Sequence, residues 1–87
     1  MAKERELVEF IVKTLVDKTD EVNVKLVEGE NTNILEIKAN PDDYGKIIGR
    51  KGRIVNSIRT LLAVAARDSG KRWVLDVPDK ETIEEEH

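Results

Sequence analysis

The sequence contains no cysteine, and its single histidine is the final residue, His87. Without cysteine no disulfide can form, a composition that suits a reducing compartment. No apolar run approaches the roughly 20 residues needed to span a bilayer. The amino-terminal MAKERELVEF mixes acids with bases and lacks the apolar core of a signal peptide. We therefore expect a cytoplasmic protein that does not enter a membrane.

The same shortages argue against an enzyme. Ser57 and Ser69 are the serines, and apart from the terminal residue no histidine is present to activate them. Asp42 and Asp43 form a carboxylate pair of the kind used for metal binding or acid–base catalysis, but their place at the start of a predicted helix favours capping. We expect no catalysis, cofactor, metal or small-molecule substrate.

What is present is an uneven distribution of charge. The net charge is −3, yet residues 1–45 and 73–87 each carry −5 and residues 46–72 carry +7. The cations of this basic block are Lys46, Arg50, Lys51, Arg53, Arg59, Arg67, Lys71 and Arg72. An acidic chain would normally not bind nucleic acid, but a local positive field favours an anionic ligand on one face.

The first half of the chain predicts one helix and two strands. Residues 4–16 have apolar side chains at helical spacing, in two adjoining rows formed by Leu7, Ile11, Leu15 and by Val8, Val12, Val16. Residues 22–26 and 33–39 alternate apolar and polar side chains, which indicates two half-buried strands. The turn-forming sequence EGEN between them favours a hairpin.

The second half predicts two more helices. Asn40 and Pro41 suit the N-cap and first position of a short helix, which Gly49 ends within two turns. A longer helix is expected from Arg53 to Asp68. Its apolar side is predicted to consist of Ile54, Ile58, Leu61, Leu62 and Ala65.

Residues 72–77 predict a third strand, and residues 79–87 are expected to form an acidic tail. The predicted order is α-β-β-α-α-β, within one domain over residues 1–78. Three helices on one face of a three-stranded sheet can bury the apolar faces of all six elements. The predicted fold class is therefore an α+β sandwich.

The stretch IIGRKGRIV, residues 47–55, joins the two predicted helices through a pair of glycines. Glycine has no Cβ, so it permits positive φ and close approach of another backbone. The first N–H groups of the following helix have no partner within it and attract anions. Arg50 and Lys51 at the tip add two positive charges. A phosphodiester backbone is the ligand that such a loop fits.

Ile48-Gly49-Arg50-Lys51-Gly52 followed by Val55 resembles the I-G-x-x-G-x-x-I/V core of the KH domain, whose GXXG loop clamps about four nucleotides. The order of elements resembles the type II KH fold, over residues from about 4 to 78. The NPDDYGKIIGRKGR and RWVLDVPD segments are similar to the KhpA-like family of small bacterial RNA-binding proteins with a single KH domain. The resemblance implies single-stranded RNA as the ligand and a role as an RNA chaperone or post-transcriptional regulator.

The resemblance also implies a set of RNA-binding residues, and the chemistry of the residues supports it. The predicted set is Lys46, Ile48, Gly49, Arg50, Lys51, Gly52 and Arg53. The glycines would shape the loop and the cations would pair with phosphates, while bases would lie in a groove walled by the two central helices and the second strand. Candidates for its apolar floor are Ile37, Ile47, Ile48 and Ile54.

The remaining basic and aromatic residues have simpler interpretations. Arg59 and Arg67 are expected on a solvated helix face, and Lys71 and Arg72 beside a strand. Trp73 is expected to pack against the core, and with so few aromatics stacking platforms should not dominate RNA binding. The acids of the tail are expected to be solvated, with competition against RNA as the alternative.

The segment LLAVAA, residues 61–66, is apolar on nearly every helical face, which a helix with one buried side does not need. It predicts self-association or a related partner through the long helix. The family resemblance implies a homodimer, or a heterodimer with a larger KH-containing Jag-type protein. The alternative function is therefore a protein–protein interaction module with little RNA binding of its own.

Overall fold

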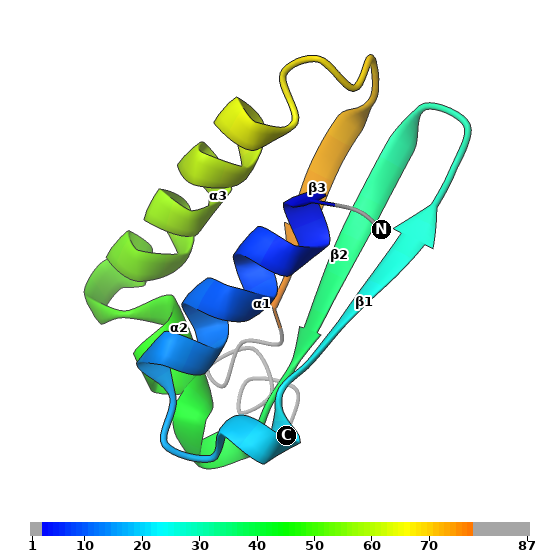
Figure 1. Ribbon diagram of the computed structural model, residues 1–87. Helices are drawn as coiled ribbons and strands as arrows, with labels where there is room; N and C mark the ends of the chain where they lie inside the picture. The colour runs from blue at the N-terminus through cyan, green and yellow to red at the C-terminus, as the bar shows by residue number, and fades with distance from the viewer. Residues whose placement is uncertain (1–2, 78–87) are drawn as a thin grey trace, which may run out of the picture.

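The computed structural model describes residues 3–77, in which three α-helices cover one face of a three-stranded sheet (Figure 1). In chain order the elements are α1 (Lys3–Leu15), η1 (Thr19–Glu21), β1 (Asn23–Glu28), β2 (Thr32–Lys38), η2 (Pro41–Asp43), α2 (Tyr44–Ile48), η3 (Arg50–Gly52), α3 (Arg53–Ala65) and β3 (Arg72–Asp76). Apart from the three short 3-10 helices, labelled η, this is the predicted α-β-β-α-α-β order. The α+β class is confirmed. The predicted tail lies outside the described residues.

The sheet has the strand order β1-β2-β3. β1 and β2 pair antiparallel, with Leu26 opposite Leu35, so the predicted hairpin is confirmed. β2 and β3 pair parallel, with Leu35 opposite Leu75. A parallel neighbour requires a crossover connection, because the chain must return to the same end of the sheet. α2, the glycine loop and α3 together form that crossover.

The core lies between the sheet and the helices. Val8 and Val12 of α1 are completely buried and are in one cluster with Val24, Leu35 and Ile37 of the sheet. The neighbouring row of α1, which contains Ile11 and Leu15, is only partly buried against this cluster. The valine row therefore faces the sheet. Each of the helices among residues 3–77 is too short or too polar to span a bilayer.

The predicted cap is confirmed at the start of η2, the 3-10 helix that leads into α2. The Asn40 side chain accepts a hydrogen bond of 2.9 Å from the Asp42 N–H, and Pro41 occupies the first position of η2. Tyr44 is 7 % exposed, and its hydroxyl oxygen accepts from the Ala39 N–H at 3.3 Å. Because α2 has only five residues, such contacts outside the helix fix its position.

The structure corrects two details of α3. The helix ends at Ala65, three residues before the predicted Asp68, and the chain continues as a turn. Leu62 is 1 % exposed but Leu61 is 51 % exposed, so Leu61 does not belong to the buried side. Successive helical residues are about 100° apart, and the side that contains Val55, Ile58 and Leu62 is the one that faces the core.

Candidate nucleic-acid interface

The GRKG loop, residues 49–52, follows α2 without an intervening linker. Gly49 ends α2 at φ 76° and ψ 172°, and its N–H donates to the Gly45 carbonyl at 2.9 Å. Lys51 at φ 56° and Gly52 at φ 75° both adopt the left-handed region. Positive φ at three of four positions produces a tight loop whose central two side chains are exposed. Glycine is required most clearly at position 49.

The space around Gly49 gives a second reason for glycine there. A Cβ atom at this position would lie 2.5 Å from Cγ1 of Ile54, a distance that real Cβ atoms do not adopt. The backbone of the loop therefore rests directly on the first turn of α3. At Gly52 the nearest atom to a Cβ would be 3.8 Å away, so that glycine is needed for its conformation and not for space.

The start of α3 has the properties of an anion site. Its N-cap is Gly52, which provides no side-chain cap, and its first turn contains no acidic residue. The Arg53 N–H donates to the Arg50 carbonyl, whereas the next N–H groups of this turn have no partner within the helix, and the helix dipole makes the site positive. Arg50, Lys51 and Arg53 surround it and are all exposed. The loop thus combines backbone donors with exposed cations at one point.

The cations in and beyond the loop are available to a ligand. Among residues 3–77, the observed ion pairs include none of Arg50, Lys51, Arg53, Arg59, Arg67 and Arg72. Those ion pairs instead use cations from α1, the segment after α1, and α2. Among residues 3–77, the exposed cations without an ion pair therefore include those of the loop, α3 and β3, together with Lys3, Lys25 and Lys38 on other elements.

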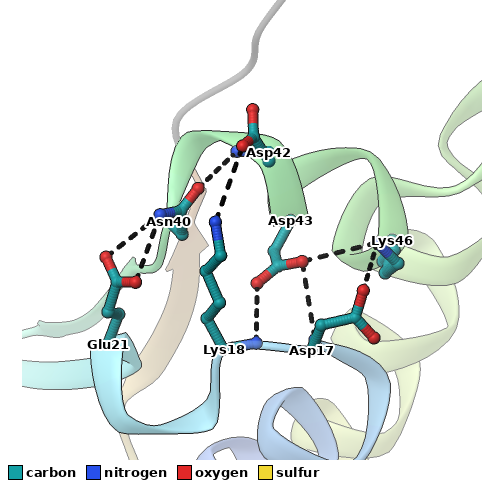
Figure 2. A network of polar contacts seen from close by, with 7 residues as sticks. All are labelled: Asp17, Lys18, Glu21, Asn40, Asp42, Asp43 and Lys46. Carbon is teal, nitrogen blue, oxygen red and sulfur yellow. Dashed lines mark hydrogen bonds and ion pairs between the residues drawn. The ribbon is translucent and has the colours of Figure 1, made fainter.

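Lys46 is the exception within the predicted set. Its Nζ lies 3.1 Å from Oδ2 of Asp17 and 3.4 Å from Oδ1 of Asp43 (Figure 2). The hydrogen bond and the charge of Asp17, followed by those of Asp43, raise the pKa of the Lys46 ammonium. Two carboxylates of its own chain therefore already pair with the Lys46 ammonium.

Asp43 does not act as the predicted cap. Its side chain makes no capping hydrogen bond at the start of α2, and its carboxylate is turned toward Asp17 and Lys18 (Figure 2). Burial works to raise the pKa of Asp43, but the N–H groups of Lys18 and Asp17 and the Lys46 ammonium together hold this pKa below 3.8. Asp42 is exposed and pairs with Lys18 at 3.7 Å. Across residues 3–77, no metal-binding group of three acidic, histidine or cysteine side chains occurs.

Of the four isoleucines predicted for an apolar floor, two are excluded by burial. Ile37 and Ile47 are completely buried in the core. Ile48 and Ile54 are partly buried and contact the edge of the core. Ile48 is at the end of α2 and Ile54 in the first turn of α3, so these two side chains flank the loop and remain candidates for contact with a base.

A hollow of about 210 Å³ lies between α3 and β3. Its lining residues are Arg59, Leu62, Arg72, Trp73, Val74 and Leu75. The wall opposite α3 in this hollow is the third strand. The predicted groove beside the second strand stays a prediction. Trp73 packs against the core as predicted, and its Nε1–H donates to Oγ of Ser69 at 2.9 Å.

Two arginines line this hollow, Arg59 and Arg72. The sequence predicted a solvated helix face for Arg59 and a place beside a strand for Arg72. Arg59 is exposed and donates to Oδ1 of Asn56 at 3.0 Å. Seven residues separate it from Gly52, about 10 Å along the helix axis. Arg72 approaches from the start of β3. Only the parallel return of β3 beside α3 brings these arginines together, and no local sequence signal could have indicated it.

The element order and the GXXG loop between α2 and α3 define a type II KH domain. Residues 5–77 match the family described as "KhpA/KhpB, KH domain". The chain belongs to this KhpA/KhpB family.

Several curated relatives are similar along nearly their whole length. The protein from Borreliella burgdorferi is 53 % identical over 87 % of this chain and 93 % of its own. The relative from Clostridium perfringens is 48 % identical over 84 % of this chain and 97 % of its own. The relative from Aquifex aeolicus is 42 % identical over 88 % of this chain and 98 % of its own. All three are named RNA-binding protein KhpA. No solved structure matches the chain significantly.

Proposed function

We propose that this protein binds single-stranded RNA, with the GRKG loop as its phosphate clamp. The observation that carries the proposal is the loop itself. It combines two glycines at positive φ, two exposed cations that form none of the ion pairs observed among residues 3–77, and the start of α3 without a side-chain cap. The relatives named RNA-binding protein support the same ligand. Binding, not catalysis, is therefore the proposed activity, and the cytoplasm its proposed location.

Within the predicted set, Arg50, Lys51 and Arg53 are proposed to pair with phosphates. Gly49 and Gly52 are proposed to let a phosphate approach the backbone, and Ile48 to contact a base. Lys46 is less available because two carboxylates already surround its ammonium.

From the loop, the RNA strand is proposed to continue along α3 into the hollow beside β3. Arg59 and Arg72 would provide further cations there, and the partly buried Val74 an apolar lining. A single site of this size, with three to five phosphate contacts, predicts weak and salt-dependent binding. For single strands each neutralised phosphate contributes about −0.7 to the slope of log K against log salt concentration.

The test is a titration of a short labelled RNA, followed by fluorescence anisotropy at several salt concentrations. Arg50→Asp/Lys51→Asp should abolish binding, while circular dichroism and the melting temperature remain close to those of the wild type. Lys13→Glu/Lys25→Glu is the matched control, because it changes the net charge equally at exposed sites outside the loop. If the loop variant binds as well as the control, the GRKG loop is only a turn and the proposal is wrong.

A second function is favoured by the outer surface of the helices. Leu61 and Val64 of α3 are 51 % and 55 % exposed, and Phe10 of α1 is 72 % exposed. Because α1 and α3 are in contact, these side chains are candidates for one exposed apolar patch, and such patches mark interaction surfaces. We propose that this surface mediates self-association, or pairing with a related KH protein of the Jag type. Two weak RNA sites joined in a dimer would gain affinity through effective concentration, which suits an RNA chaperone or post-transcriptional regulator.

Sedimentation measurements separate the two functions. Leu61→Asp should convert a dimer into a monomer at tens of micromolar while the isolated protein remains folded, because the substituted side chain is outside the core. Arg50→Asp/Lys51→Asp should leave the dimer intact. A wild-type protein that is already monomeric at this concentration would contradict self-association.

A further inference from the structure

We propose that Asp43 is a positioning residue for the GRKG loop: its buried carboxylate anchors α2, and with it the loop, to the chain that leaves α1. Lys46 would belong to this anchor and would not contact phosphate. The proposal deepens the proposed RNA-binding function and rests on it for its binding readout.

The first observation is the burial of Asp43. Its residue exposure is 2 %, on a chain where the other aspartates described are exposed. Its Oδ2 accepts from the Lys18 N–H at 3.1 Å, and its Oδ1 from the Asp17 N–H at 3.5 Å and the Lys46 ammonium at 3.4 Å. A buried carboxylate is tolerated only when it is hydrogen-bonded and paired in this way. Its position is therefore closely determined.

The second observation is what these contacts connect. Asp17 and Lys18 lie between α1 and η1, about 25 residues before Asp43 in the chain. Lys46 lies one turn further along α2 and adds to this connection, because its ammonium bridges the carboxylates of Asp43 and Asp17. Figure 2 shows the carboxylate of Asp43 directed across the gap between the two segments.

Two exposed contacts join the same segments. The Asn40 amide donates to both carboxylate oxygens of Glu21, at 3.1 and 3.2 Å. The Lys18 ammonium lies 3.7 Å from Oδ2 of Asp42. Exposed contacts of this kind contribute little individually. Asp43 is the buried acceptor at this junction. If its carboxylate is lost, water cannot replace the hydrogen bonds that it accepts from the segment after α1.

The third observation is the shortness of the path from the anchor to the loop. α2 has five residues, and Gly49 follows its last residue directly. A helix of this length has no stable position of its own. A shift of its first turn is therefore transmitted to Arg50 and Lys51, and binding sites require their groups within about 0.5 Å of the productive geometry.

The experiment compares Asp43→Asn with Asp42→Asn, the same chemical change one residue earlier at an exposed position. Asp43→Asn should weaken RNA binding by roughly threefold to tenfold, the scale for residues that influence a site without touching its ligand. Asp42→Asn should bind as the wild type does. Val24→Ala, a core truncation in β1, provides a folded variant of lowered stability and should also keep its affinity.

Two readouts separate positioning from mere stability. In ¹⁵N spectra of the free protein, Asp43→Asn should shift the amides of residues 49–52, and Asp42→Asn and Val24→Ala should not. Lys46→Gln should weaken binding without changing the salt slope, whereas Lys51→Gln should reduce the slope by about 0.7. If Asp43→Asn does not fold, the shifts of the loop amides and the RNA affinity are both measured on Lys46→Gln instead.

The outcomes distinguish the two proposals. Unchanged loop amides and wild-type affinity in Asp43→Asn would overturn the inference, as would an equal loss of affinity in Val24→Ala. A salt slope reduced in Lys46→Gln as much as in Lys51→Gln would assign Lys46 to phosphate and overturn that part. If the wild type itself binds no RNA, the proposed function fails, and the loop amides alone decide whether Asp43 positions the loop.

Discussion

Replacing Gly49 by alanine should destabilise the protein more than alanine at any other glycine of the loop region. Two separate effects act at this position. The backbone has φ 76° and ψ 172°, a region that residues with a Cβ adopt at a cost of about 1–3 kcal/mol. The new Cβ would also lie 2.5 Å from Cγ1 of Ile54, and overpacking of this kind costs about 1–3 kcal/mol.

Together these effects predict a loss of about 2–6 kcal/mol in the free energy of unfolding. For a domain of this size, each kcal/mol lowers the melting temperature by about 4–8 °C, so the decrease should be at least about 8 °C. Urea denaturation followed by circular dichroism measures the change directly, provided that the m-value stays constant.

The other glycines provide graded controls. Gly70 has φ 75° and open space around it, so Gly70→Ala should cost only about 1–2 kcal/mol for its left-handed backbone. Gly45 is inside α2, and the space that a Cβ would occupy there is open, so Gly45→Ala should stabilise by about 0.5–1 kcal/mol. If Gly49→Ala costs no more than Gly70→Ala, the close contact between the loop and Ile54 does not constrain the loop, and the reasoning is refuted.

Two further predictions concern burial and pH. Leu62→Ala should lower the free energy of unfolding by about 2–5 kcal/mol because Leu62 is in the core, whereas Leu61→Ala in the monomer should change it by less than about 1 kcal/mol. Equal losses in urea denaturation would contradict the conclusion that α3 turns Leu62 toward the core and Leu61 toward solvent. The pKa of Asp43 is lowered on folding from 3.8, so its contribution to stability is complete above that value and disappears as the pH falls through and below it. The difference in melting temperature between the wild type and Asp43→Asn should therefore narrow between about pH 6 and about pH 3, and a constant difference would show that the charge of Asp43 does not stabilise the fold.

The sequence by itself determined the order of elements and the place of the loop. Both depend on local chemistry: side-chain periodicity for α1 and the strands, Asn40 and Pro41 for the start of η2, and a pair of glycines for the loop. Each of these signals is contained within a few residues, so it can be recognised without knowledge of the folded chain. The resemblance to the KH domain depended on the same short motif, and the family match confirms it.

Only the tertiary structure decided which of the predicted residues face a ligand. It buried Ile37 and Ile47, paired Lys46 with carboxylates, and turned Asp43 from the expected cap to a contact with the segment after α1. It also brought Arg59 and Arg72 to one hollow. Apart from the Lys46–Asp43 pair, these contacts join residues from 13 to 29 positions apart in the chain. Such contacts depend on how the helices dock on the sheet. The local sequence determines the backbone conformation of a residue, whereas tertiary packing determines which distant residues it contacts.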